Sequence, residues 1–359
     1  MKRAVLWLFA LAVLGAAGFA GWRWLDERRF AGTPYGEGTR TVNIPPGTGP
    51  RALARLLADA HVVSDAGRFY THLHWFRRDA HTKAGEYEFE GPLRPDDVLG
   101  KLMHGDVKLY RFTIAEGLRI DEIAPIVEQT GLCSAADFLR IARDPASPRK
   151  YGVPGPSLEG YLFPDTYVMS RGAGCPGVVQ VMVGRFQKAW QQAQAHRLPS
   201  VQMNELQALT LASIVEKETG MSQERAHVSC VFHNRLKRGM RLQTDPTVIY
   251  ALLLSNDFKW DKNIHKKDLS LQHPYNTYVV SGLPPGPIAN PGAAAMVAAV
   301  HPLQCNDLYF VSRNDGTTAF CPNLKCHNEN VKKFQVEYFR RPRASATVSR
   351  RSARNGGTQ

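Results

Sequence analysis

The distribution of apolar residues divides the chain into regions with different predicted structures. Residues 4–22 form an uncharged, mostly apolar run, long enough to cross a bilayer as one helix of about 20 residues. Residues 41–156 combine short β-type runs with short helical patterns, whereas residues 157–340 contain longer helical patterns separated by loops rich in proline and glycine. We therefore predict an α+β protein with a single N-terminal transmembrane helix, small β–α modules and then a mixed α/β domain.

The flanks of the apolar run bear on its orientation. Lys2 and Arg3 precede it, and Trp22 and Trp24 follow it at the position of the far membrane interface. A cleaved signal peptide is the alternative, because the small residues near position 20 resemble a cleavage site. The run is longer than a typical signal-peptide core, which favours an uncleaved signal anchor with a short cytoplasmic N-terminus.

A unit made of a strand, a glycine turn and a helix occurs twice, at residues 41–59 and 112–127. Placing Ile44 on Ile114 aligns the glycines and three apolar helix positions: Gly47 with Gly117, Leu53 with Ile123, Leu56 with Ile126 and Leu57 with Val127. A further strand and helix are expected between the copies, at residues 84–89 and 94–103. Small modules of this kind bind extended polymers or act as spacers, and the pattern leaves both roles open.

Residues 208–220 predict an amphipathic helix that ends in two carboxylates, Glu216 and Glu218. Glu218 continues an apolar stripe made of Ala208, Leu211, Ile214 and Val215, and Glu216 continues the opposite row through Leu209 and Ala212. A carboxylate that ends an apolar stripe is partly desolvated, which raises its pKa and suits a general acid near neutral pH. Two solvated charges in a last helical turn are the alternative, and this helix alone does not decide between them.

Three other segments carry polar or aromatic groups. Residues 157–167 combine aromatic rings with carboxylates, which suits sugar binding and equally the edge of an ordinary core. In residues 240–250, Thr244 or Asp245 before a proline is typical of a helix N-cap. Residues 275–286 form a proline-rich loop with amides and hydroxyls, which suits the lining of a polar cleft.

Composition narrows the class of protein. A chain of 359 residues is expected to form two or three folded units, and its formal net charge of +13 indicates an anionic partner or surface. Part of that charge lies in residues 341–359, which have no apolar period and are predicted to be disordered. Nucleic-acid binding is one interpretation of the charge, but the N-terminal apolar run argues against it.

The six cysteines contain no C-x-x-C pair, so the sequence does not predict a metal site. If the bulk of the chain is exported, disulfides are permitted. The expected pairs are Cys133–Cys175 and one pair among Cys305, Cys321 and Cys326. Cys230, on an apolar helix face, is expected to be a buried free thiol.

The motifs occur in one order along the chain. They are Glu159-Gly-Tyr-Leu-Phe-Pro-Asp-Thr-Tyr, Ala212-Ser-Ile-Val-Glu-Lys-Glu-Thr, Gly239-Met-Arg-Leu-Gln-Thr-Asp-Pro-Thr, Tyr275-Asn-Thr-Tyr, Gly282-Leu-Pro-Pro-Gly-Pro-Ile and His327-Asn. In these motifs the chain resembles the membrane-anchored endolytic peptidoglycan transglycosylases, the MltG or YceG-like family. The resemblance extends from the apolar run to about residue 338.

The resemblance implies a single-pass protein of the inner (cytoplasmic) membrane with its catalytic domain in the periplasm. The predicted organisation is a cytoplasmic end (1–3), a transmembrane signal anchor (4–22), a linker (23–40), a LysM-like module (41–110), a second strand–turn–helix module (111–156), a catalytic domain (157–340) and a disordered basic tail (341–359). Its partners are then the membrane and peptidoglycan glycan strands, with peptidoglycan synthases as a further expectation and no nucleic acid.

The resemblance also implies the chemistry. Members of this family cut nascent strands internally at the MurNAc–GlcNAc β-1,4 bond, leave 1,6-anhydro-MurNAc ends and help to terminate glycan elongation. Ordinary glycosidases use two carboxylates. Here the 6-hydroxyl of MurNAc is the nucleophile, so a single carboxylic acid suffices and no cofactor is expected.

By position in the motif, the catalytic residue of the family corresponds to Glu218, which agrees with the helical-face argument. The other expected contacts with substrate are Glu159, Glu216, Arg241, Gln243, Thr244, Asp245, Tyr275, Asn276 and His327. The chain departs from the family at Thr318, where relatives often carry histidine, and at Cys321 and Cys326, which make a local disulfide conceivable.

Two rival functions remain at this stage. The first is a hydrolase, a muramidase, on the same scaffold. The second is a non-catalytic protein that binds peptidoglycan and serves as a scaffold.

Overall fold

The computed structural model describes residues 2–76, 81–256 and 263–340. The chain forms two compact units: the first comprises Met1–Ile114, Ile123–Ile141 and Asp165–Val181, and the second comprises Ala115–Glu122, Ala142–Pro164 and Met182–Gln359. The units are therefore interleaved in sequence, and their limits differ from the predicted domain ranges. The predicted tail, residues 341–359, lies outside the described residues, as does Met1.

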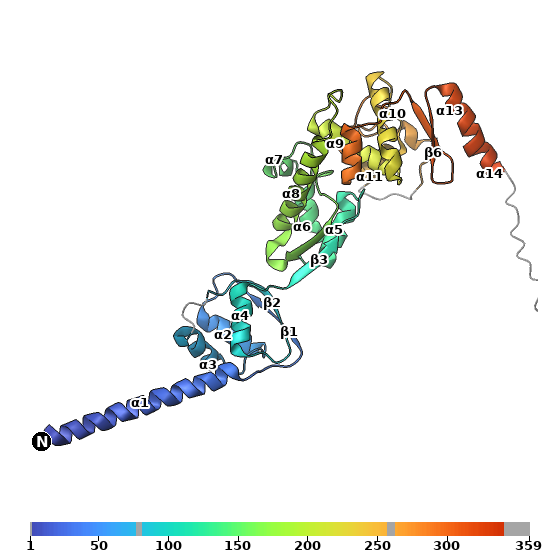
Figure 1. The fold of residues 1–359 in the computed structure, drawn as a ribbon. Helices are drawn as coiled ribbons and strands as arrows, with labels where there is room; N and C mark the ends of the chain where they lie inside the picture. Colours follow the sequence, from blue (N-terminus) through green and yellow to red (C-terminus); the bar gives the residue numbers. More distant parts are fainter. Residues whose placement is uncertain (1, 77–80, 257–262, 341–359) are drawn as a thin grey trace, which may run out of the picture. The chain divides into compact units, whose positions relative to one another are not determined.

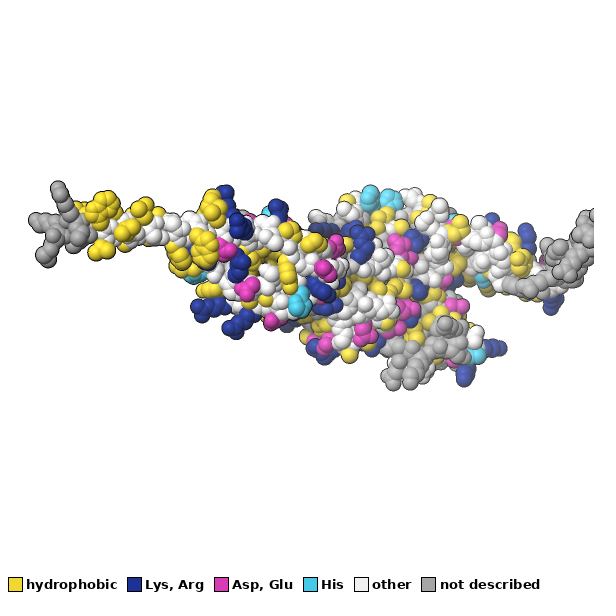
Figure 2. All heavy atoms as spheres, turned by 90° about the horizontal axis from the view of Figure 1, so that it is seen from below, with side chains coloured by type: hydrophobic (Ala, Val, Ile, Leu, Met, Phe, Trp, Pro, Cys, Tyr) yellow, Lys and Arg dark blue, Asp and Glu magenta, His cyan; other side chains and the backbone are white. Residues whose placement is uncertain are grey.

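The first unit begins with the long helix α1 (Lys2–Gly32), shown in Figure 1. Within it, Leu6–Gly32 is long and apolar enough to cross a membrane, and Figure 2 shows its exposed hydrophobic side chains. Such a helix fits a membrane anchor or a signal sequence. It continues ten residues beyond the predicted end at residue 22, so much of the predicted linker is helical. The reason is tertiary contact, because Phe30 is buried and Asp26 pairs with Arg68 at 2.9 Å.

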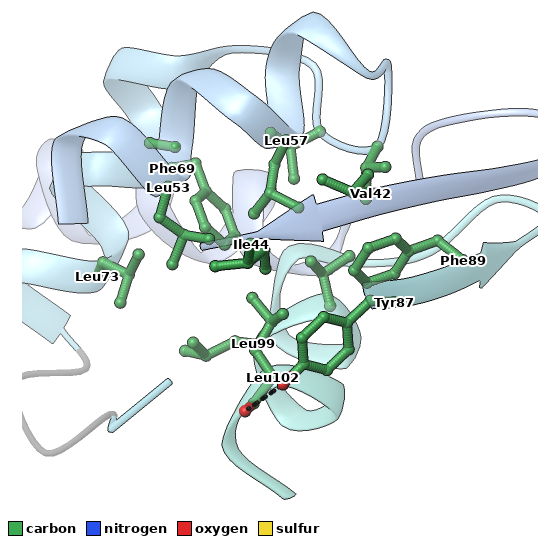
Figure 3. Packing of buried hydrophobic residues seen from close by; sticks show 14 of the residues in the cluster. Val42, Ile44, Leu53, Leu57, Phe69, Leu73, Tyr87, Phe89, Leu99 and Leu102 are labelled. Atoms are coloured by element: carbon green, nitrogen blue, oxygen red, sulfur yellow. Dashed lines mark hydrogen bonds between the residues drawn. The ribbon is translucent and has the colours of Figure 1, made fainter. Parts of the chain in front are cut away.

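The first small module follows α1 in the chain. Its elements are β1 (Thr39–Ile44), α2 (Pro50–Asp59), α3 (Ala66–Thr71), η1 (His72–Phe76), β2 (Gly85–Glu90) and α4 (Pro95–His104). β1 and β2 are antiparallel, with Val42 opposite Tyr87. Figure 3 shows the apolar faces of α2 and α4 meeting the sheet around Leu57, Tyr87 and Leu102. The buried hydroxyl of Tyr87 donates hydrogen bonds to the carbonyls of Lys83 (2.8 Å) and Leu102 (3.4 Å).

The second module repeats this order of strands and helices. Its elements are β3 (Leu109–Thr113), α5 (Ile120–Gln129), α6 (Ala135–Arg143), α7 (Ser147–Lys150), β4 (Thr166–Ser170), η2 (Arg171–Ala173) and α8 (Gly174–Gln194). β3 and β4 are antiparallel, with Phe112 opposite Tyr167. Both predicted strand–turn–helix units are therefore present. Gly47 and Gly117 occupy equivalent turns with φ of 79° and 75°, in the left-handed region that glycine adopts without strain.

The part of the second unit that follows α8 is built around one helix, α9 (Glu205–Glu218). It contacts α10 (Arg225–Lys237), α11 (Asp245–Ser255) and α12 (Ala293–Val300). The remaining elements are η3 (Ser222–Glu224), η4 (Asp268–Ser270), β5 (Tyr309–Ser312), β6 (Thr318–Cys321), α13 (Leu324–Val331), η5 (Lys332–Glu337) and α14 (Tyr338–Arg340). β5 and β6 form an antiparallel pair.

The expected amphipathic character of α9 is wrong. All eight residues from Ala208 to Val215 are buried, so the helix has no solvent-facing side over this stretch. The hydroxyl residues of this buried stretch, Thr210 and Ser213, satisfy their polar atoms within the helix. Thr210 donates to the carbonyl of Leu206 and Ser213 to that of Thr210, both at 2.7 Å.

All six cysteines, each within the described ranges, are paired. The bonds are Cys133–Cys175, Cys230–Cys305 and Cys321–Cys326. The first and the last confirm the sequence predictions. The prediction of a free thiol at Cys230 is wrong. Cys230 is buried on α10 as expected, but the loop after α12 covers the same helix face and brings Cys305 to it.

Candidate active site

Glu218 is the last residue of α9, where the helix ends and the chain becomes extended at Thr219. The residue is partly exposed, but protein atoms surround its carboxyl group. This burial, together with the nearby charge of Asp245, raises the pKa of Glu218 to about 7. A carboxyl group with such a pKa is substantially protonated near neutral pH, as a general acid requires.

Thr244 is the direct partner of Glu218. Its hydroxyl donates a hydrogen bond to Oε1 of Glu218, and this contact favours the ionised form of the acid. Within the described residues, Oε2 has no hydrogen-bond donor. Thr244 is also the N-cap residue of α11, in agreement with the sequence prediction of a cap at this position. The cap of one helix therefore supports the acid at the end of another.

Two buried threonines that the sequence analysis missed hold Thr244 in place. The backbone N–H of Thr244 donates to the hydroxyl of Thr277 at 3.1 Å, and that hydroxyl lies 2.8 Å from the hydroxyl of Thr247. Thr247 in turn donates to the carbonyl of Thr244 at 2.7 Å. Thr277 follows Asn276 in the motif Tyr275-Asn-Thr-Tyr. Its place in this motif was the sequence signal that could have identified it.

Gln243, just before Thr244, has φ of 49°, in the left-handed region that non-glycine residues seldom adopt. Its side chain is exposed, and its backbone N–H donates to the carbonyl of Thr277 at 3.2 Å. Strained backbone of this kind persists where surrounding contacts enforce it, and it is concentrated at functional sites.

Arg241, Gln243, Asp245 and Tyr278 lie beside Glu218 at the protein surface, and we call these four residues the active-site rim. The hydroxyl of Tyr278 donates to Oδ1 of Asp245 at 2.7 Å, and the guanidinium of Arg241 donates to the carbonyl of Tyr278 at 3.0 Å. Burial and the neighbouring Asp245 raise the pKa of Tyr278, which keeps its hydroxyl protonated. Three predicted residues, Arg241, Gln243 and Asp245, thus lie around Thr244, and Tyr278 joins them.

Arg235 is a buried cation near Glu218 that the sequence analysis did not select. Its guanidinium donates to the carbonyls of Leu308 and Leu242, each at 2.7 Å, and its positive charge opposes the rise in the pKa of Glu218. The ring of Tyr309 lies 5.2 Å from the guanidinium. Arg235 therefore joins β5 to the segment that carries Thr244.

His327 lies behind Tyr309, with ring centroids 5.1 Å apart. Burial, and secondarily the charge of Arg235, lower the pKa of His327, so its imidazole is neutral at neutral pH. Its Nδ1 is buried and has no hydrogen-bond partner within the described part of the chain. Thr318, where the resemblance to the family leads us to expect histidine, binds Glu224 through its backbone N–H (2.9 Å) and its hydroxyl (2.6 Å).

Glu216 is separated from Glu218, as the face geometry predicted. Its two carboxylate oxygens accept from Arg225 at 2.7 Å and from the backbone N–H of Gly292 at 2.9 Å. Burial raises its pKa, while these two donors oppose that rise. With both oxygens engaged, Glu216 ties α9 to the starts of α10 and α12. Its predicted contact with substrate stays untested.

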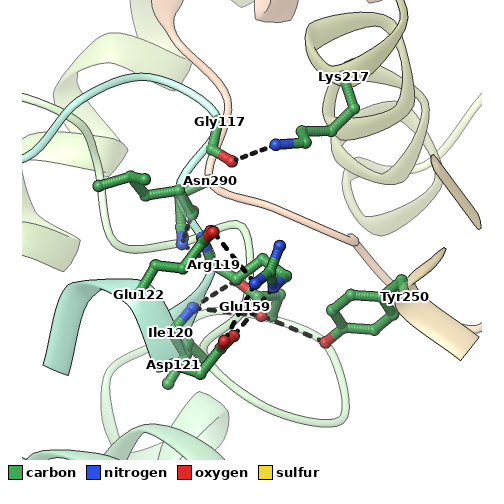
Figure 4. Close-up of polar contacts among 10 residues, drawn as sticks. Gly117, Arg119, Ile120, Asp121, Glu122, Glu159, Lys217, Tyr250 and Asn290 are labelled. Carbon is green, nitrogen blue, oxygen red and sulfur yellow. Dashed lines mark hydrogen bonds and ion pairs between the residues drawn. The ribbon is translucent and has the colours of Figure 1, made fainter. Parts of the chain in front are cut away.

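Glu159 lies in a second buried cluster, shown in Figure 4. Its carboxyl group accepts from the backbone N–H of Ile120 (3.1 Å), the amide of Asn290 (3.0 Å) and the hydroxyl of Tyr250 (3.2 Å). Burial and the nearby Asp121 raise the pKa of Glu159 to about 8. Tyr250 belongs to α11, whose N-cap residue Thr244 is the partner of Glu218, so the cluster supports that helix.

Tyr275 and Asn276 have different surroundings. The ring of Tyr275 lies 4.9 Å from that of Tyr250, and burial raises its pKa to about 12. Asn276 is fully buried and holds its own loop, since its amide donates to the carbonyl of Leu271 at 2.9 Å and accepts from the N–H of Tyr278 at 3.0 Å. Substrate contact by these two residues remains a prediction.

One group of side chains has the composition of a metal site. His227, Cys305 and Asp307 have ligand atoms within 4.8 Å of one another. However, Cys305 is in a disulfide and His227 is bound to Asp307 at 2.8 Å. Because a metal requires the thiolate form of cysteine, this group does not fit one in the oxidised protein.

Comparison with known proteins gives consistent matches. A profile of the YceG-like family matches residues 42–333. The endolytic murein transglycosylase of Bacillus subtilis is 29% identical over 312 residues, which cover 82% of this chain and 85% of the relative. That of Streptococcus pneumoniae D39 is 27% identical over 362 positions, and the match spans 91% of this chain but only 64% of the relative.

A solved structure agrees with these relatives. A crystal structure of a YceG-like protein from Listeria monocytogenes has a TM-score of 0.54 and 32% sequence identity, and the match covers 81% of this chain and 98% of that one. The family profile covers well over half of the chain; it begins within β1 and includes the rest of both small modules and α9 to α13. The chain belongs to the YceG-like family.

Proposed function

We propose that this protein is an endolytic murein transglycosylase that cuts glycan strands at the MurNAc–GlcNAc β-1,4 bond with Glu218 as its general acid and base. The names of the relatives support the activity. The observation that carries the assignment of the residue is the carboxyl group of Glu218. It is buried, has a pKa near 7, and lies next to an exposed rim of polar side chains.

The reaction needs one carboxyl group that acts first as a general acid and then as a general base. Protonated Glu218 donates its proton to the oxygen of the leaving sugar while the glycosidic C–O bond breaks. The 6-hydroxyl of the MurNAc residue bonds to C1, and Glu218 takes up the proton that this hydroxyl loses. The product is a 1,6-anhydro ring, no water is consumed, and the enzyme returns to its starting protonation state.

The neighbours of Glu218 suit this cycle. The hydroxyl of Thr244 holds Oε1, which leaves Oε2 to carry the transferred proton. Arg235 favours the carboxylate that exists after proton donation, because its positive charge lowers the pKa of Glu218. Together the two groups limit the effect of burial, so that the acid can both lose and regain a proton near neutral pH.

The N-terminal half fits a membrane-bound enzyme. We assign α1 as an uncleaved signal anchor in the inner membrane, with the rest of the described chain in the periplasm. The three disulfides suit an oxidising compartment outside the cytoplasm. We assign the first small module as LysM-like and as a holder of glycan. In this position the enzyme would act on nascent strands, terminate their elongation and meet peptidoglycan synthases.

Product analysis tests this proposal. Purified protein is incubated with murein, and soluble products are identified by mass spectrometry for the wild type, Glu218→Gln and Glu329→Gln. Glu329 is an exposed carboxylate on α13 and serves as the matched control. We expect internal cuts with anhydro ends from the wild type and the control, and a loss of at least 1,000-fold (on the order of the effect of removing an essential catalytic group) in Glu218→Gln.

The rival functions give other results. Reducing ends in place of anhydro ends would identify a muramidase. A wild type that binds murein without cutting it would identify a scaffold. Full activity of Glu218→Gln would contradict the assignment of Glu218 as the general acid and base, but it would leave the family membership unchanged.

A further inference from the structure

A large cavity lies in the second unit, apart from the carboxyl group of Glu218. Its volume is about 1120 Å³, and Glu218 is not among its lining residues. Four segments line it: the loop before α9 with the first turns of α9, the last turns of α10, the loop at residues 282–285 and the loop at residues 302–306. A space of this size is large enough for an extended ligand of several residues.

The cavity and the candidate active site share three parts of the chain. In α9, Thr210 lines the cavity and Glu218 follows eight residues later, which is about 12 Å along the helix axis. In α10, Lys237 lines the cavity and Arg235 approaches Glu218. The loop that contributes Leu283 to the cavity begins just after Tyr278 of the active-site rim. The cavity and Glu218 therefore lie on the same structural elements, and a polymeric ligand is long enough to span this separation.

The chemistry of the lining points to the class of ligand. Among the described residues that line the cavity, Lys237 is the only Lys or Arg and there is no Asp or Glu. Prolines and leucines form its apolar walls, and amides such as Gln202 and Gln304 supply donors and acceptors. The lining therefore suits a ligand with a peptide backbone, small apolar side chains and an anionic group.

His233 adds a hydrogen-bonding group to this wall. Its Nε2 lies 2.9 Å from the carbonyl of Ala299, so the proton of a neutral ring is held there and Nδ1 is an acceptor. Burial lowers the pKa of His233, so the ring is neutral at neutral pH. The wall thus offers an acceptor for a peptide N–H, besides the single cation.

We propose that this cavity binds the carboxylate-bearing peptide that murein carries on alternate sugars, while the glycan itself occupies the site at Glu218. This inference rests on the proposed function, since it assigns a second part of the same substrate to a second place. Lys237 would face a peptide carboxylate, and Leu283 and Pro284 would contact its apolar side chains. The enzyme would therefore prefer strands that keep their peptides over strands that have lost them.

The first experiment compares cleavage of two substrates by the full-length protein: glycan strands with peptides and the same strands after removal of the peptides by an amidase. We expect the wild type to have the higher kcat/KM on peptide-bearing strands. Lys237→Ala should reduce this preference by roughly fivefold through KM, and should leave cleavage of bare strands unchanged. Arg238→Ala, which alters an exposed neighbour that does not line the cavity, should behave like the wild type.

A second pair of variants tests whether filling the cavity removes the preference for peptide-bearing strands. Ser200 is exposed and lines the cavity, so Ser200→Trp should occupy part of it, whereas Ser200→Ala should not. We expect the tryptophan variant to lose the preference for peptide-bearing strands and the alanine variant to keep it. Equal kcat/KM on both substrates for the wild type, or an unchanged preference in both Lys237→Ala and Ser200→Trp, would overturn the proposal.

A binding measurement separates this inference from the proposed function. A synthetic murein tetrapeptide is titrated into Glu218→Gln, and binding is followed by NMR shifts of residues that line the cavity. We expect saturable shifts that Lys237→Ala weakens by roughly fivefold. This readout needs no cleavage, so it remains decisive even if the protein proves to be a scaffold. An absence of shifts at millimolar peptide would refute the cavity as a peptide site.

Discussion

The hydroxyl of Thr244 donates a hydrogen bond to Oε1 of Glu218, and so the N-cap of α11 is joined to the C-terminal residue of α9. The contact favours the carboxylate, and it acts against the burial that favours the protonated acid. The pKa of Glu218 is thus set by two opposing effects: burial raises it, and the hydrogen bond from Thr244 lowers it.

The first prediction concerns this balance. Thr244→Val keeps the shape of the side chain but removes the donor, so the pKa of Glu218 should rise further. We expect the alkaline limit of the pH profile of kcat/KM to move upward by about one unit and kcat to fall about tenfold. Thr244→Ser retains the hydroxyl and should keep both values. Identical profiles for the valine variant and the wild type would show that the contact does not act on the acid.

The second prediction concerns activity and pH in the wild type. The chemical step needs Glu218 protonated, and its pKa is raised to about 7 by burial. We therefore expect kcat/KM to be level below this pH and to fall about tenfold per unit above it. Initial rates on soluble glycan strands between pH 5 and pH 9 measure this. A plateau that continues to pH 9 would be incompatible with Glu218 as the acid.

The third prediction concerns stability and Glu159. Its pKa is raised to about 8 in the native protein from an ordinary value of 4.5, so the native state keeps a proton that the unfolded chain releases. The free energy of unfolding should therefore fall as the pH rises between these two values, by as much as roughly 1.4 kcal/mol per pH unit. Glu159→Gln has no such proton and should remove this part of the slope.

Urea unfolding at several pH values between 5 and 8 measures the effect of Glu159. Glu329→Gln, which alters an exposed carboxylate, is the control and should keep the slope of the wild type. If Glu159→Gln also keeps that slope, the proton is not held at Glu159.

The fourth prediction compares two disulfides. Cys230–Cys305 joins residues 75 apart in sequence, and Cys321–Cys326 joins residues 5 apart. A longer closed loop restricts the unfolded chain more, so Cys230→Ala/Cys305→Ala should lower the free energy of unfolding by roughly 2 kcal/mol more than Cys321→Ala/Cys326→Ala. Denaturant unfolding without reductant compares the two double variants, and an equal loss in both would contradict this account.

The two glutamates show how far sequence reasoning reached in the site. Residues two apart on a helix point in different directions, and Glu216 and Glu218 indeed have separate partners. The same reasoning was wrong about the helix as a whole, because three other helices surround α9 and its polar residues bond internally. Local spacing fixed the directions of the side chains, whereas packing partners decided their burial.

The repeated small module was predictable for a related reason. Glycine turns and apolar residues at helical spacing are local signals, and they recur in both copies. The interleaving of the compact units was not predictable, because β3 pairs with β4 from a segment more than fifty residues later. Arg235 was missed for the same reason, since its importance comes from carbonyls of distant residues such as Leu308.

The continuous helix α1 has a mechanical consequence. Its last turns hold the first module through the buried Phe30, the pair of Asp26 with Arg68 and the bond of Glu27 to His72. A flexible tether would let that module reorient independently of an anchor. Here three contacts fix the last turns of α1 to the module, so, with α1 in a bilayer as we propose, tilting or rotation of the helix would turn the β1–β2 sheet with it.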